Sequence, residues 1–264
     1  MMQRGLESAM EAGHIEAEGW KAKAASALRF MRDAAEETLW PTRCVGCGRP
    51  ETLLCDECRL SLPWISQRDA CPVCGAPYGA TLCTECKGDW CVRTTICAMS
   101  FEGTAARLVR IYKDQHETRL ARIMAAAIAT ALDEAEGCVL PDGGPRFDPD
   151  DIDAICFVPA TPDALRTRGF DHMELVAKHL TYELGLPLAD VLVKDSVKDQ
   201  RDLGREARRE NLEGTVEAIE DVSDMHLLLV DDVVTTGASI EASAEALLRR
   251  GARAVTAAAF ARVW

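Results

Sequence analysis

Apolar residues in the second half of the chain follow two alternating patterns. Short runs that are almost free of polar residues are typical of buried strands, and they alternate with segments that repeat apolar residues at helical spacing. The predicted strands are Ala154–Val158, Leu188–Val193, His226–Val230 and Ala254–Val263. The predicted helices are His172–Leu184 and Ser239–Arg250, each followed by a glycine. Uninterrupted strands that alternate with helices indicate an α/β fold with a parallel sheet covered on both faces.

The first half of the chain is organised differently. An apolar face over residues 1–40 predicts a helical extension that ends at Pro41, and a second apolar stripe predicts helix over residues 105–135. Residues 136–153 are rich in Gly, Pro and Asp and predict a surface loop. We therefore divide the 264 residues into a helical extension (1–40), a cysteine-rich module (41–90) and a main domain (91–264).

Eight of the twelve cysteines form four C-x-x-C pairs within the cysteine-rich module. The pairs are Cys44/Cys47, Cys55/Cys58, Cys71/Cys74 and Cys83/Cys86. Seven residues separate the first two pairs and eight separate the last two. Two sulfurs at this spacing can reach one tetrahedral ion from a tight turn, so the module predicts a small double zinc ribbon with one or two structural zinc ions. Sequential pairing is the simplest scheme, and an interleaved scheme or a site that has lost its metal stays open.

Reduced cysteines without metal and a thioredoxin-type redox pair are the alternatives. A redox motif needs one C-x-x-C pair near a βαβ unit, and four regularly spaced pairs therefore favour zinc. Sites closed by four thiolates are structural, so we expect the chemistry to lie in the main domain. The remaining cysteines lack partner spacing and are expected to be buried thiols: Cys91, Cys97, Cys138 and Cys156.

The segment Leu227–Ser239 joins a buried strand to two adjacent carboxylates, a Thr/Thr/Gly loop and the start of a helix. Gly237 lets the backbone approach an anion closely, and the helix start points N–H groups and a positive dipole end at that anion. Asp231 and Asp232 would repel the anion, so they suit ligand hydroxyls or the waters around Mg²⁺. The segment therefore predicts a site for a phosphorylated sugar. The alternatives are a receiver-type phospho-acceptor or two acids that solvate a loop, and a P-loop NTPase is disfavoured because its signature is absent.

Composition narrows the function further. The formal net charge of −13 argues against a protein that coats duplex DNA by neutralising phosphates. The longest apolar stretch, Ile123–Leu132, is far too short for a membrane span, so no membrane association is expected. The first residues do not read as a secretory signal, which predicts a cytoplasmic protein with reduced thiols.

Val230–Ser239 resembles the phosphoribosyl-pyrophosphate (PRPP) signature of type I phosphoribosyltransferases. With four C-x-x-C pairs upstream, the chain is similar to the ComF (competence protein F) family, which joins a double zinc ribbon to a phosphoribosyltransferase-like domain. Further segments that resemble the family are Tyr112-Lys113, Val158-Pro159, Arg166–Phe170, Gln200–Leu203 and Arg208–Gly214. Two places depart from it: Asp171-His172 stands where the family usually has Asn-Gln, and Val216 where an aromatic residue is common.

The resemblance implies a site for PRPP and Mg²⁺. Asp231 and Asp232 would hold the ribose hydroxyls, directly or through waters on Mg²⁺, and Arg168 would neutralise the diphosphate; these are the implied catalytic residues. The implied PRPP-binding residues are Val233, Val234, Thr235, Thr236, Gly237, Ala238 and Ser239 in the phosphate loop, Pro159, Ala160 and Thr161 after the first predicted strand, and the basic residues Lys113, Arg166 and Arg208.

Three of the basic residues also have simpler interpretations. Arg166 could be an ordinary solvated arginine, and Lys113 could face solvent from a helix. Arg208 lies in a charged segment, Gln200–Asn211, which is either an exposed helix or a loop that folds over the substrate. No role is assigned to His116, His172 and His179, because they have neither metal-like spacing nor a visible nucleophile partner.

Two functions fit these expectations. The first is a transferase that moves the phosphoribosyl group of Mg-PRPP to an unknown acceptor, in a family associated with competence and DNA uptake. The second is a non-catalytic competence factor, in which the zinc ribbon docks a DNA-uptake or helicase protein and the PRPP site is a sensor or a relic. Direct single-strand DNA binding through the ribbon is disfavoured by the acidic chain and by the lack of interleaved aromatic and basic residues.

Overall fold

The computed structural model describes residues 41–80, 83–86, 90–194 and 216–264. The helix expected over residues 1–40 and the segment Gln200–Asn211 with Arg208 lie outside the described residues. The chain divides into two compact units, Met1–Cys55 and Asp56–Trp264, and the second contains the sheet and the helices around it.

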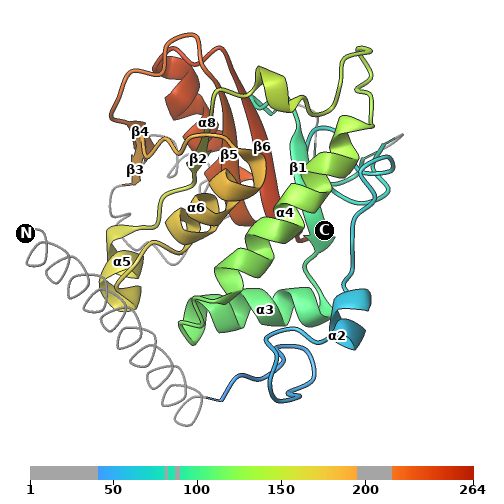
Figure 1. Cartoon of the computed structure of the whole chain (residues 1–264). Helices are drawn as coiled ribbons and strands as arrows, with labels where there is room; N and C mark the ends of the chain where they lie inside the picture. Colours follow the sequence, from blue (N-terminus) through green and yellow to red (C-terminus); the bar gives the residue numbers. More distant parts are fainter. Residues whose placement is uncertain (1–40, 81–82, 87–89, 195–215) are drawn as a thin grey trace, which may run out of the picture. The chain divides into compact units, whose positions relative to one another are not determined.

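Four parallel strands form the central sheet of the second unit, in the order β1 (Thr95–Ser100), β6 (Ala254–Arg262), β5 (His226–Val234) and β2 (Ala154–Phe157). Each neighbouring pair is parallel. The strands are buried almost throughout, which is why their sequences read as continuous apolar runs. The predicted parallel α/β fold is therefore confirmed (Figure 1).

Helices cover both faces of this sheet. Helices α4 (Leu120–Glu136) and α6 (His172–Leu184) lie together on one face, and α8 (Ala238–Arg249) lies on the other (Figure 1). Each helix buries one stripe; that of α6 contains Met173, Val176, Ala177 and Leu180. The core beneath α8 joins Leu227 and Leu229 of β5 to Ile240 and Leu247 of the helix. Alternate residues of each strand thus meet different helices.

Several elements differ from the expected ones. The helix expected over 105–135 is two helices, α3 (Gly103–Asp114) and α4, and His116 lies between them in the left-handed region with φ 58°. In place of a strand over Leu188–Val193, a short β3 (Leu192–Lys194) pairs antiparallel with β4 (Val216–Ala218) in a separate two-stranded sheet. Strand β1 was not predicted. The described residues also contain three short helices: α2 (Asp56–Leu60), η1 (Pro149–Asp151) and α5 (Pro162–Arg168).

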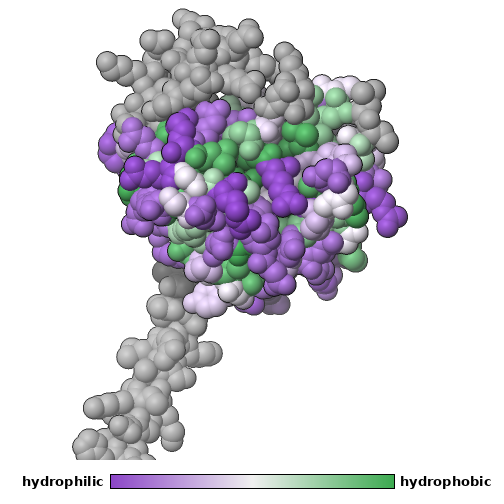
Figure 2. Space-filling view, turned by 90° about the horizontal axis from the view of Figure 1, so that it is seen from above, coloured by the Kyte–Doolittle hydropathy of each residue, from purple (hydrophilic) through white to green (hydrophobic). Residues whose placement is uncertain are grey.

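The loop expected over residues 136–153 is more buried than its composition indicates. It contains η1 and an antiparallel bridge between Val139 and Pro145, and Arg146 and Phe147 are both buried. The surface of the described residues shows small apolar groups among hydrophilic ones on the face in Figure 2. Among the described residues, no helix combines the length and the apolar character that a membrane crossing requires.

Candidate functional site

Asp231 and Asp232 lie inside β5, not after it as predicted. Pairing with β6 continues through Val234, so the strand is four residues longer than the apolar run His226–Val230. Pairing with β2 ends at Val230, and the two acids therefore lie where one edge of β5 is no longer joined to a strand. They are buried, with 8% and 3% exposure, and successive strand residues point to opposite faces of the sheet.

Two basic side chains from different helices hold Asp232. The ammonium group of Lys113, in the last turn of α3, forms an ion pair with its carboxylate. The Nε2 atom of His172, the first residue of α6, lies 3.0 Å from Oδ2 of the same carboxylate. Lys113 therefore lies at the acid pair and does not simply face solvent, which was the simpler interpretation of this residue.

His172 was given no role from the sequence, yet it connects Arg168 to Asp232. The guanidinium Nη1 of Arg168 lies 3.3 Å from Nδ1 of His172. Because a guanidinium only donates hydrogen bonds, Nδ1 must accept, and the proton of a neutral imidazole then sits on Nε2 and points at Asp232. A chain of hydrogen bonds therefore runs from Arg168 through His172 to the carboxylate.

The two adjacent carboxyl groups have opposite pKa shifts. Burial raises the pKa of Asp231, and the neighbouring charge of Asp232 raises it further. Burial would also raise the pKa of Asp232, but the hydrogen bond from His172 and the charge of Lys113 outweigh it and lower that pKa. The ionised form is therefore favoured at Asp232, and the protonated form is favoured at Asp231.

The loop after β5 has the composition expected of a phosphate cradle. Thr235 and Thr236 are exposed, and α8 begins immediately afterwards at Ala238. Gly237 precedes the helix with φ +84°, a conformation that glycine adopts without strain. A Cβ atom at this position would lie 2.2 Å from Cη2 of Trp90, so the indole ring packs directly against the glycine backbone. Gly237 is thus required by its φ angle and by close contact with Trp90.

The loop after β2 is already hydrogen-bonded within the chain. The N–H group of Ala160 donates to Oδ2 of Asp171 at 2.8 Å. The other oxygen of Asp171 accepts from the first amides of α6, so this residue caps the helix that carries His172. Thr161 caps α5 in the same way through Ala164. This loop and the acid pair are therefore joined through consecutive residues, Asp171 and His172.

Not every predicted site residue lies at the acid pair. Arg166 is exposed and pairs with Asp163 one helical turn away, as an ordinary solvated arginine does. Asp171, His172, Trp90 and Arg262 contact the site but were not predicted. For Asp171 and His172 the sequence held one signal, because they stand where the ComF family usually has Asn-Gln. A different pair of residues in a site loop indicates different contacts there.

The eight paired cysteines form two clusters in the sequential scheme: Cys44, Cys47, Cys55 and Cys58, and Cys71, Cys74, Cys83 and Cys86. Within each cluster the ligand atoms lie within 4.8 Å of one another. Four sulfurs at about 2.3 Å from one tetrahedral zinc are about 3.8 Å apart. The observed sulfur–sulfur distances agree: 3.6 Å for Cys44–Cys55 and Cys74–Cys83, and 3.7 Å for Cys71–Cys86. Both clusters could therefore hold zinc.

Tight turns produce this geometry in both clusters. The amide of Gly48 donates to the carbonyl of Cys44, and the amide of Gly75 donates to the carbonyl of Cys71. Both glycines have positive φ angles, 77° and 69°, so the chain can turn sharply directly after the second cysteine of each pair. A Cβ on Gly75 would lie 2.6 Å from the Cys97 sulfur, so the second turn also packs tightly against β1.

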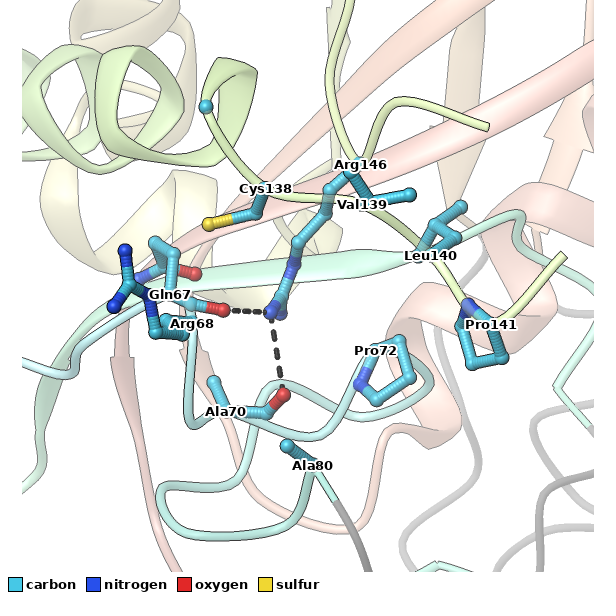
Figure 3. Close-up of a pocket in the computed structure, with 11 residues that line it drawn as sticks. Gln67, Arg68, Ala70, Pro72, Ala80, Cys138, Val139, Leu140, Pro141 and Arg146 are labelled. Carbon is cyan, nitrogen blue, oxygen red and sulfur yellow. Dashed lines mark hydrogen bonds between the residues drawn. The ribbon is translucent and has the colours of Figure 1, made fainter. Parts of the chain in front are cut away.

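A separate cavity of about 280 Å³ lies between residues 67–80 and 137–146 (Figure 3). Gln67, Cys138, Leu140 and Arg146 are among the residues that line it. None of the lining residues belongs to the segment 231–239, so this cavity is distinct from the candidate sugar-phosphate site.

Comparisons with known proteins show a domain match and similar proteins. Residues 173–263 match the family model described as phosphoribosyl transferase domain. Two proteins named DNA utilization protein YhgH, from Salmonella typhi and from Salmonella typhimurium (strain LT2), are each 27% identical over 233 residues, which cover 81% of this chain and 94% of the relative. The chain therefore contains a phosphoribosyltransferase-like domain and is similar over most of its length to a DNA utilization protein.

Two solved structures are also similar to part of the chain. Both are described as an analysis of an invariant aspartic acid in HPRTs, one as the glutamine mutant and one as the glutamic acid mutant. Each is 12% identical with a TM-score of 0.32, over 54% of this chain and 67% of the other.

Substitution of Asp231 by Asn tests the energetic effect of its buried charge. The folded-state pKa is raised above the unfolded value of about 3.9, so the wild type loses stability as the pH rises between these two values. We expect D231N to be more stable than the wild type by about 1–3 kcal/mol near pH 8, because Asn keeps the shape without the charge. The difference should vanish as the pH falls to about 4.

Urea unfolding of both proteins across this pH range measures the effect. The exposed Asp163, changed to Asn, is the matched control and should show no such trend. A difference between D231N and the wild type that does not change with pH would contradict the expected burial of the charge.

The two clusters are tested by Cys47→Ser and Cys83→Ser, one variant for each. Each should lower the zinc content of the full chain by about one ion, since a site with three thiolates and a serine binds zinc much more weakly. Elemental analysis of purified protein gives the stoichiometry. Equal zinc content in the wild type and in Cys83→Ser would rule out metal at the second cluster.

Proposed function

We propose that this protein is a ComF-like phosphoribosyltransferase that binds Mg-PRPP at the carboxyl end of β5 and transfers its phosphoribosyl group to an acceptor. The observation that carries the proposal is the buried acid pair directly before a Thr/Thr/Gly loop and the start of α8. It lies within the segment that matches the phosphoribosyl transferase domain. The similarity to a DNA utilization protein over 81% of this chain supports the same assignment.

The loop residues suit the 5′-phosphate of the sugar. Thr235 and Thr236 present hydroxyl groups to solvent, and the amides at the start of α8 add donors and the positive end of the helix dipole. The neighbouring carboxylates suit the ribose hydroxyls. An ionised Asp232 accepts hydrogen bonds, and hydroxyl groups can donate them whereas an ionised phosphate cannot. Carboxylate oxygens also fit Mg²⁺, which binds few protein ligands and keeps several waters.

The diphosphate would lie on the Asp232 side of β5. Lys113 and Arg168 are the described cations closest to Asp232 and its partner His172, and both would neutralise charge on the leaving group. In the transfer, the bond between ribose C1 and the diphosphate oxygen breaks, and a bond from the acceptor nucleophile to C1 forms. Bound Mg²⁺ would neutralise part of the diphosphate charge. The chain's own residues would act by positioning and by electrostatic stabilisation.

A second function, a PRPP sensor without turnover, is favoured by one observation. The amide of Ala160 and the carboxylate of Asp232, which a substrate would use, already have partners within the chain. The Ala160 amide donates to Asp171, and Asp232 is paired with Lys113 and His172. Asp171 also puts a carboxylate at the loop expected to hold a diphosphate. Such a site would bind PRPP weakly and would serve a competence factor that docks its partner through the zinc ribbon.

Binding of Mg-PRPP is tested first by Asp232→Asn. The change removes the charge that Lys113 and His172 hold in place, and we expect at least a tenfold loss of affinity, which corresponds to about 1.4 kcal/mol. Titration calorimetry on the full chain measures it, with the exposed Asp163→Asn as control. Unchanged affinity in D232N would contradict the assignment of this site, and no heat with the wild type would contradict the proposed function altogether.

Asp171→Asn separates the two candidate functions. Asn can still cap α6 with its oxygen, but it carries no charge and can release the Ala160 amide. We expect D171N to bind Mg-PRPP several-fold more tightly because a buried like-charge repulsion of roughly 1 kcal/mol is relieved. Pyrophosphate release with the wild type supports the transferase, and binding without release in both proteins supports the sensor.

A further inference from the structure

Two arginines lie deeply buried beside the second cysteine cluster (Cys71, Cys74, Cys83 and Cys86). Arg146, which follows the Val139–Pro145 bridge, is 3% exposed, and Arg262, the last residue of β6, is 2% exposed. Figure 3 shows the guanidinium group of Arg146 turned inward to the carbonyls of Gln67 and Ala70. Arginine is rarely buried to this extent without an ionic partner.

The partners of both guanidinium groups are backbone carbonyls. Arg146 also donates to the carbonyls of Cys71 at 3.2 Å and Thr95 at 3.0 Å. Arg262 donates to the carbonyl of Cys74 at 2.9 Å and to the carbonyls of Val234, Thr235 and Val263. Among the described residues, no carboxylate lies within ion-pair distance of either arginine. Within the described part of the chain, these carbonyls leave the buried Nε of Arg146 without a hydrogen-bond partner, and they supply neither guanidinium group with a counter-charge in direct contact.

The nearest candidate for that counter-charge is the second cluster itself. Each arginine donates to the carbonyl of a different cluster cysteine, Cys71 or Cys74, so the two cations lie on the two halves of one turn. Four thiolates around one Zn²⁺ carry a net charge of about −2. Two guanidinium groups supply the matching positive charge, whereas four protonated thiols would supply none.

We propose that Arg146 and Arg262 are the counter-ions of a zinc–tetrathiolate centre at the second cluster, and that Arg262 and Trp90 couple the metal state of this centre to the loop Val234–Gly237. This inference concerns the chain's own residues around the metal and does not depend on the proposed transferase function.

Arg262 forms the first connection to the loop. Its Nε donates to Cys74, while its Nη1 donates to the carbonyls of Val234 at 3.2 Å and Thr235 at 2.7 Å. One rigid, planar group therefore holds the cysteine turn and the beginning of the loop together. A change in the charge of the cysteine cluster, which lies beside Nε, therefore acts on the same guanidinium group that holds the loop.

Trp90 forms the second connection. Trp90 packs against the buried Cys71, Cys74 and Ala76, and it also packs against the core beneath α8. The ring edge contacts the backbone of Gly237, where no side chain intervenes. The next residue is fixed to α8, because the amide of Cys91 donates to the Glu241 carboxylate at 3.1 Å. Trp90 therefore cannot move with the cluster without changing its contact with the loop.

Loss of the metal should loosen the loop. Protonated thiols are neutral, so the two buried arginines would lose their counter-charge and would rearrange toward solvent or other partners. The carbonyls of Val234 and Thr235 would then lose the donor from Arg262, although that of Val234 would keep the amide of Val263, and Trp90 would lose the packing of an ordered cluster. The amides of residues 234–240 should exchange their hydrogens faster, because local opening becomes easier.

Hydrogen exchange on the full-length Cys47→Ser variant tests this coupling. The variant leaves the second cluster as the one able to lose zinc, so chelator treatment acts on that cluster alone. We expect zinc removal to speed exchange over residues 234–240 at least about tenfold, with no change in β2, which β5 separates from β6 and Arg262. Unchanged exchange in 234–240 after the zinc is lost, or no zinc at the second cluster in the purified protein, overturns the proposal.

Arg262→Met tests the counter-ion role directly. Arg249→Met is the control, because Arg249 is exposed and forms its ion pair with Glu245 within α8. Substitution of an outer residue that supports a metal site typically weakens binding by about 10–100-fold. We expect R262M, and R146M likewise, to release zinc to a colorimetric chelator at least about tenfold faster than R249M. In cobalt-loaded protein the thiolate charge-transfer absorption should weaken in parallel.

Equal release rates for R262M and R249M would overturn the counter-ion role. Should R262M fail to fold, the exchange experiment on Cys47→Ser still decides the coupling, because it leaves both arginines in place. Arg262→Lys keeps the charge but not the planar fork, and it should retain zinc while residues 234–240 still lose protection.

Discussion

A carboxylate that stays ionised while it is buried at the end of β5 is the constraint on which the candidate site depends. Asp232 is 3% exposed, and a charge at this depth needs both an ionic partner and hydrogen bonds. Lys113 reaches it from α3 and His172 from α6, so the carboxylate fixes the ends of two helices relative to one strand. Tyr112, next to Lys113, strengthens the arrangement by donating to the carbonyl of His172. The same interactions that stabilise the charge therefore position the functional groups around it.

The sheet itself could largely be predicted because hydrophobic periodicity reports burial. Strands β2, β5 and β6 and helices α6 and α8 all have buried stripes that the sequence displays. Strand β1 was missed because Thr95 and Ser100 at its ends are polar, although both are buried. The full length of β5 was missed because two acids interrupt its apolar run. Its pairing with β6 continues past them because backbone hydrogen bonds do not depend on side-chain polarity.

The contacts within the site could be predicted only in part. The Thr/Thr/Gly loop and the acid pair are local patterns, and a short segment displays them completely. His172 and Asp232 are 60 residues apart in sequence, and their contact depends on how α6 packs against the sheet. Arg262 and Cys74 are 188 residues apart, so no spacing rule could have joined them. Patterns at one helix or strand thus predicted which residues carry chemistry, whereas tertiary packing decided which of them meet.

Strand geometry gives the two adjacent acids unlike surroundings. Successive side chains of β5 alternate between faces, so Asp232 points toward the face covered by α6, where Lys113 and His172 supply positive charge and a donor. Asp231 points toward the α8 face, where burial and the charge of Asp232 raise its pKa more than Lys113 and Lys194 lower it. Two identical side chains at consecutive positions therefore separate into one fixed anion and one group that exchanges its proton readily. A site built this way can accept hydrogen bonds from sugar hydroxyls without concentrating two negative charges beside a phosphate.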